Sequence, residues 1–100
     1  MPNKIQFTKV ACNDIKQLFQ FFLKKNPHSA SQLLEGIKRA IALLEHSPFS
    51  CRKSRSDNPF LRELLLSFNS GGCVALFKIE ENLIVTILAV RYQREDDYYL

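Results

Sequence analysis

The side chains best suited to binding another macromolecule gather near the end of the chain. Arg91, Tyr92, Arg94 and Tyr98 follow the last long apolar run. Arginine and tyrosine are enriched among the residues that contribute most to binding at protein interfaces. The cluster is therefore a candidate binding surface, and packing within the domain is the alternative explanation for it.

Arg62 is a further candidate, because its charge falls on the apolar side of a predicted strand. It has the same parity as three apolar residues, Leu64, Leu66 and Phe68. Alternate residues of a strand share a face, and an unpaired charge on an apolar face is costly. Arg62 therefore needs a partner, which is either an acid such as Glu95 or Asp97 or a group on another protein.

The remaining reactive side chains form no catalytic or metal-binding pattern. His28 and His46 lie near predicted helix ends, with no acid or nucleophile at a telling spacing. The three cysteines are widely spaced and form no CxxC pair: Cys12, Cys51 and Cys73. Gly71-Gly72 is better explained by a hairpin turn than by a phosphate-binding loop. We assign no catalytic residue, no metal ligand and no cofactor from these residues.

Composition predicts a single domain over residues 1–100. Hydrophobic residues make up 46% and charged residues 24%, the balance of a folded domain rather than a disordered chain. The longest apolar run, Leu83 to Val90, is far shorter than the ~20 residues that span a bilayer. Met1 to Gln6 contains no apolar block of signal-peptide length, so we expect a cytoplasmic protein.

The charge balance narrows the class of partner. The net charge of +4 and the pI of about 9.1 favour an acidic partner, either nucleic acid or an acidic protein. An excess that only keeps a small domain soluble is the third possibility.

Hydropathy predicts two helices after a short first strand around Ile5 and Phe7. One helix begins near Val10, with apolar residues at steps of three and four, and ends at Lys24 to Pro27. The other keeps the same period from Ala30 to Leu44, and Ser29 with Gln32 is a candidate capping box at its start. Gly36 lies inside it and is expected to allow close approach of a neighbouring element.

Three further strands are predicted after a basic loop at residues 49–59, which carries Arg52, Lys53 and Arg55. They span Leu61 to Phe68, Cys73 to Glu80 and Leu83 to Val90, and the short turns between them require antiparallel pairing. Apolar residues occupy both parities of the last two strands, so both faces of the sheet must be covered. The helices can cover one face, and the C-terminal segment 91–100 is the candidate for the other.

These elements predict an α+β fold in the order β-α-α-β-β-β. An antiparallel helix hairpin is expected to pack on one face of a small antiparallel sheet.

Several sequence strings resemble the RelE/ParE toxin superfamily, most closely its ParE branch. The most specific is the C-terminal string, where ParE-like chains commonly carry ILAV, then Arg, an aromatic or His, Gln, Arg and Glu, followed by Asp and Tyr. This chain reproduces the pattern from Ile87 to Tyr98, with Tyr92 where His is usual. The other strings are Ala11 to Ile15, Asn26-Pro27 with Ala30, Leu44 to Pro48, and Arg62 to Leu64.

The resemblance implies a toxin of a type II toxin–antitoxin system, of the kind that serves plasmid stabilisation and causes growth arrest. ParE-like toxins inhibit DNA gyrase, whereas RelE-like toxins cut messenger RNA on the ribosome. RNA cleavage needs a base, an acid and cations on the phosphate. The RelE pattern implies Arg94 and Tyr98 or Tyr99 in these roles, with Lys53 and Arg55 imitating its loop lysines.

That catalytic set is incomplete, because Asn69-Ser70 stands about where RelE-like nucleases carry an arginine. We therefore favour a non-catalytic gyrase inhibitor. The alternatives are a ribosome-dependent mRNA endonuclease and a degenerate module that only binds antitoxin.

The expected partner is a cognate antitoxin that is acidic, helical and partly disordered when free. It should offer an amphipathic helix or an extended segment to the sheet edges and grooves of so short a chain. We expect no membrane association, and no direct DNA binding by the toxin alone.

Overall fold

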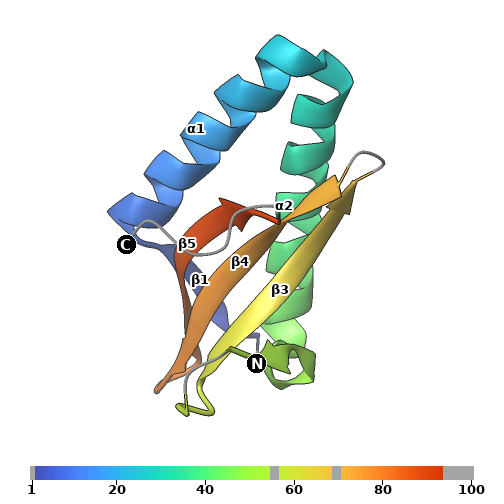
Figure 1. Ribbon diagram of the computed structural model, residues 1–100. Coiled ribbons are helices and arrows are strands. Elements are labelled where there is room, and N and C mark those ends of the chain that lie inside the picture. The colour runs from blue at the N-terminus through green and yellow to red at the C-terminus, as the bar shows by residue number, and fades with distance from the viewer. Residues whose placement is uncertain (1, 55–56, 69–70, 94–100) are drawn as a thin grey trace.

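The computed structural model of the protein describes residues 2–54, 57–68 and 71–93, which form a five-stranded sheet with two helices packed on one face (Figure 1). The elements follow the predicted order, with a 3₁₀ turn and a two-residue strand added between the helices and the last three strands. The α+β fold class is therefore confirmed.

Helix α1 (Lys9–Lys25) begins where the chain leaves the first strand. The Thr8 hydroxyl oxygen accepts a hydrogen bond from the backbone N–H of Ala11 at 3.1 Å, which caps the helix, and the same hydroxyl donates to the carbonyl of Leu88 at 2.9 Å. One side chain thus starts the helix and ties it to the sheet.

Helix α2 (Pro27–His46) begins two residues before the predicted cap. Asn26 caps it by accepting from the N–H of His28 at 3.1 Å, and Pro27 occupies the first turn, where its missing N–H costs nothing. Ser29 is buried inside the helix, so the capping box predicted from Ser29 and Gln32 was wrong.

The sheet is mixed rather than wholly antiparallel. Its order is β1 (Lys4–Phe7), β5 (Ile84–Tyr92), β4 (Gly71–Glu80), β3 (Leu61–Phe68) and β2 (Arg52–Lys53). β3, β4 and β5 pair antiparallel, as their short turns require, whereas β1 runs parallel to β5. No turn joins β1 to its neighbour in space, so turn length carried no information about its direction.

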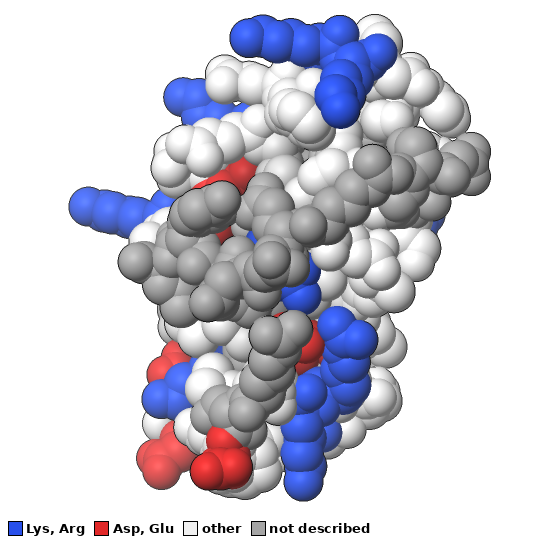
Figure 2. Space-filling model, in the orientation of Figure 1, with Lys and Arg blue, Asp and Glu red and all other residues white. Residues whose placement is uncertain are grey.

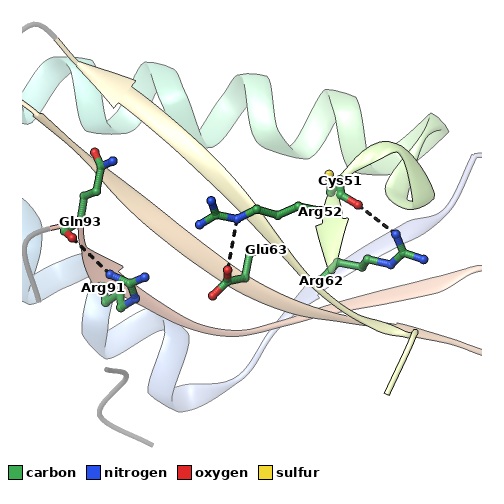
Figure 3. Close-up of polar contacts among 6 residues, drawn as sticks. All are labelled: Cys51, Arg52, Arg62, Glu63, Arg91 and Gln93. Carbon is green, nitrogen blue, oxygen red and sulfur yellow. Dashed lines mark hydrogen bonds and ion pairs between the residues drawn. The ribbon is translucent and has the colours of Figure 1, made fainter. Parts of the chain in front are cut away.

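The loop predicted over residues 49–59 contains regular structure. A 3₁₀ turn, η1 (Pro48–Ser50), leads into β2, which pairs with Arg62 and Glu63 of β3. Arg52 of β2 forms an ion pair with Glu63, with its Nε 3.2 Å from the carboxylate (Figure 3). Arg55 lies outside the described residues.

The main core lies between the helices and the sheet. Its innermost large side chains include Leu33 and Leu44 of α2 with Phe77 and Val85 of the sheet. Residues of the other parity, Val74, Leu76 and Ala89, are buried too, on the face away from the helices. Both faces are therefore covered, as the sequence predicted. The segment expected to cover the second face, 91–100, lies outside the described residues beyond Gln93.

No helix in the described part of the chain is both long enough and apolar enough to cross a membrane.

Candidate functional site

Arg62 lies on the helix side of β3, as its parity predicted, and binds backbone carbonyl groups. Its Nε donates to Pro59 at 2.8 Å and its Nη1 donates to Cys51 at 3.0 Å, while the guanidinium lies 5.2 Å from the ring centre of Phe49 (Figure 3). The expected acid partners, Glu95 and Asp97, lie outside the described residues. Arg62 therefore joins η1 to the start of β3.

Arg91 and Tyr92, the described half of the C-terminal cluster, lie on opposite faces of β5. Tyr92 faces the helices, where its ring centre is 5.4 Å from that of Phe22 and 6.0 Å from that of Phe21. Arg91 points to the second face, and its Nη1 donates to the carbonyl of Gln93 at 3.4 Å (Figure 3). Arg91 and Tyr92 were predicted to contribute to one binding surface, but the structure places them on opposite faces of the sheet. Arg94 and Tyr98 are not among the described residues.

Of the residues that the RelE pattern implies for catalysis, only Lys53 falls within the described chain. It is exposed on the edge strand β2 and stands opposite Arg62, on the helix side of the sheet. Arg91 lies on the other side, so the structure does not bring these two cations together. Arg55, Arg94, Tyr98 and Tyr99 lie outside the described residues.

Cys51 is not an activated nucleophile. Its thiol is buried, and burial raises its pKa above the ordinary value, although a hydrogen bond from Ser50 and the charge of Arg62 act in the opposite direction. A thiol of raised pKa carries little thiolate at neutral pH. Among residues 2–54, 57–68 and 71–93, no three His, Cys, Asp or Glu side chains are grouped so that they could hold a metal ion.

Sequence reasoning did not locate the open edge of β3. β2 covers only Arg62 and Glu63, so Leu64–Phe68 has no strand neighbour on that side within the described chain. The carbonyl of Leu61 accepts from Ser54 on this side of the strand, at 3.0 Å. Because backbone groups alternate in direction along a strand, Leu65 and Ser67 direct their N–H and C=O groups to the same side.

A groove of about 280 Å³ runs beside this edge, between α2 and β3. Its walls are mostly apolar: Leu43 of α2 is 39% exposed, and Leu64 and Leu66 of β3 face the helix side. Arg39 is the one charged residue among the described residues of the lining, which are Gly36, Arg39, Ala40, Leu43 and Leu64–Ser67. We call this feature the α2–β3 groove. An open strand edge beside an apolar wall can accept an extended peptide, which would pair with the backbone and place alternate side chains in the groove.

The arrangement of helix hairpin and mixed sheet also occurs in a solved protein structure. A solved structure titled "Chromosomal ParDE TA system from P. aeruginosa" superposes with a TM-score of 0.66, covering 90% of this chain and 95% of that one. The two sequences are 16% identical, so this likeness concerns the fold.

The sequence identifies the family. A family model described as "ParE toxin of type II toxin-antitoxin system, parDE" matches residues 5–97. The chain therefore belongs to the ParE toxin family, and its partner class is a cognate antitoxin. A search of curated proteins gave no match.

Proposed function

We propose that this ParE toxin acts in the cytoplasm by binding DNA gyrase and inhibiting it without catalysis. Membership of the ParE family carries the proposal, because the ParE branch is the one whose resemblance implies gyrase as the target.

The α2–β3 groove is our proposed site for the antitoxin. Apolar side chains of an extended segment would contact Leu43 and Leu64, and an acidic side chain would pair with Arg39. The outward backbone groups of Leu65 and Ser67 would supply hydrogen bonds that depend little on the sequence of the antitoxin.

Two parallel assays test the target. The purified toxin is added to a DNA supercoiling reaction with gyrase and to an in-vitro translation reaction. We expect supercoiling to be inhibited while translation continues. Arrest of translation with normal supercoiling would instead identify an mRNA endonuclease, and no effect in either assay would identify a module that only binds antitoxin.

Substitutions in the groove test the antitoxin site. We expect Leu43→Asp to weaken binding of the antitoxin encoded beside the toxin gene by tenfold or more, about 1.4 kcal/mol, because it places a charge in the apolar wall. Leu34→Asp is the matched control, since Leu34 is equally exposed on α2 but does not line the groove.

A substitution at Ser67 tests whether the antitoxin pairs with the open edge of β3. Ser67→Pro removes an N–H that points to the open edge and leaves the pairing of β3 with β4 in place. Circular dichroism checks that the variant folds. Antitoxin affinity equal to that of the wild type for both Leu43→Asp and Ser67→Pro would exclude this groove as the site.

A further inference from the structure

The solvent face of α1 carries a continuous row of hydrogen-bond donors. Five exposed residues follow each other at steps of four, three, four and four positions: Lys9, Asn13, Lys16, Gln20 and Lys24. This spacing places them on one side of a helix, opposite the buried residues Ala11, Leu18 and Phe22. We call this row the α1 ridge.

The α1 ridge has no acidic counterpart on its own helix. The single carboxylate of α1 is Asp14, which is 7% exposed and accepts a hydrogen bond from the N–H of Val90 at 3.0 Å. Within residues 2–54, 57–68 and 71–93, no ion pair is formed by the three ridge lysines. Exposed helices generally mix both signs of charge, so a ridge of cations and amides favours an anionic partner.

From this ridge we infer that α1 binds the sugar–phosphate backbone of duplex DNA. Lysine, asparagine and glutamine are common donors to phosphate oxygens. A protein partner is less well matched, because protein interfaces are depleted in lysine and rely on apolar and aromatic anchors, whereas all five ridge side chains are polar and Leu23 is the exposed apolar residue beside them. The ridge also has no aromatic side chain on which the bases of a single strand could stack.

The dimensions and position of the ridge suit this role. From Lys9 to Lys24 it rises 15 residues at about 1.5 Å each, or roughly 22 Å, which corresponds to about six base pairs at 3.4 Å. α1 lies at the side of the molecule, and basic side chains project into solvent along that side (Figures 1 and 2). The α2–β3 groove lies between other elements, so antitoxin and DNA could be bound together.

This inference is opposite to the sequence-based expectation that the toxin alone does not bind DNA, and the experiment below decides between the two. The net charge of +4 left nucleic acid and acidic protein open. Sorting the lysines by helix face favours nucleic acid, because three of them share one uninterrupted face.

The test is a titration of a fluorescent duplex with the purified full-length toxin, followed by anisotropy at several salt concentrations. Contacts from three lysines predict weak, sequence-independent binding, with log K falling against log salt at a slope of about −2.7. The ridge variant carries Lys9→Gln, Lys16→Gln and Lys24→Gln. We expect it to lose at least tenfold in affinity and most of the salt slope.

The matched control carries Lys4→Gln, Lys38→Gln and Lys78→Gln. These three lysines are also exposed, but they lie on β1, α2 and β4. Both triple variants reduce the net charge from +4 to +1 (4 − 3 = 1), so they separate the effect of the ridge from that of total charge. The control is expected to keep the wild-type slope, and equal losses in the two variants would overturn the inference.

Cys12 supplies a second readout. It is exposed between Lys9 and Lys16 on α1, whereas Cys51 and Cys73 are buried. Bound duplex should therefore slow alkylation of Cys12 several-fold in the wild type and leave it unchanged in the ridge variant.

Three outcomes would overturn the inference. The first is that the toxin does not bind duplex DNA at low salt, and the second is that it binds single-stranded RNA more tightly than duplex DNA. The third is that the ridge variant binds DNA as well as the wild type does but binds polyglutamate more weakly. The assay contains no gyrase, so its failure is distinct from failure of the proposed function.

Discussion

Asp14 is a buried carboxylate whose partner is a backbone group. Its Oδ2 accepts from the N–H of Val90 at 3.0 Å. Val90 lies on β5 beyond the position where β1 ends, since the last pair of that ladder joins Phe7 to Ile87. The carboxylate therefore provides the acceptor that a longer β1 would have provided, and it links α1 to the edge of the sheet.

Replacing Asp14 should destabilise the protein. Asp14→Ala leaves a buried N–H without an acceptor, at a cost of about 1–3 kcal/mol, and each 1 kcal/mol should lower Tm by about 4–8 °C in a domain of this size. Asp14→Asn keeps an acceptor oxygen and should lose less. Thermal unfolding followed by circular dichroism measures both. An unchanged Tm for Asp14→Ala would show that this hydrogen bond does not stabilise the fold.

Cys51 makes the stability of the fold change with pH in the alkaline range. Burial raises the pKa of its thiol above the ordinary value of 9.0, so the folded state holds this proton more tightly than the unfolded state. The stability that the protonated Cys51 thiol gives the folded state is fully present below pH 9.0. It is lost as the pH rises through the pKa of this thiol in the folded state. Urea unfolding from about pH 8 to pH 10 should show a smaller loss of stability for Cys51→Ala than for the wild type. Cys12→Ser, at the exposed cysteine, should follow the wild type.

Among the elements, η1 and β2 are linked to β3 by the guanidinium of Arg62, in addition to the pairing of β2 with β3 and the ion pair between Arg52 and Glu63. Arg62 donates to the carbonyls of Pro59 and Cys51, which lie on the two sides of β2 in the sequence, and it stacks against Phe49. The rings of Phe49 and Phe60 in turn contact each other with their centres 6.2 Å apart. Arg62 therefore reinforces the position of a segment that has only two strand residues.

Arg62→Ala should loosen this segment. We expect a loss of about 1–2 kcal/mol, discounted for the partial exposure of the side chain, with faster amide hydrogen exchange at Cys51 and Ser54. Arg62→Lys should recover little, because an ammonium group cannot reproduce the planar fork of donors. Exchange rates equal to those of the wild type would mean that other contacts hold η1 and β2.

Local patterns in the sequence predicted the elements but not every contact between them. Period and turn length placed both helices and the β3–β4–β5 meander, and strand parity placed Arg62 on the helix side. The partners of Arg62 could not be predicted, because they are carbonyls of a loop without periodicity. The cap at Asn26 was missed because a short linker that joins two helices offers several polar residues as caps.

At the scale of the whole molecule, the α2–β3 groove is a property of tertiary structure. Arg39 and Leu43 come from one helix and Leu65 from a strand that follows an intervening loop. From the sequence alone, Leu43 and Leu65 could be recognised as apolar residues, but not as residues that line the same groove. Gly36, which the sequence analysis singled out inside its helix, also lines this groove.

The net charge of the molecule should control how fast its antitoxin binds. A toxin of charge +4 attracts an acidic partner over a distance that salt shortens to about 10 Å at 0.1 M. The association rate measured by stopped-flow fluorescence should therefore fall as salt is added, with a smaller change in the dissociation rate. A rate independent of salt would contradict the expectation of an acidic antitoxin.

The pairing of β1 with β5 also governs when a newly made chain can complete its sheet. Lys4 pairs with Ile84 and Phe7 with Ile87, so the first strand emerges from the ribosome long before its neighbour exists. At about 5–20 residues per second, translation of the intervening chain takes roughly 4–16 s. During that interval the nascent toxin lacks its finished sheet, so every surface that depends on β5 forms only after Ile87 has emerged.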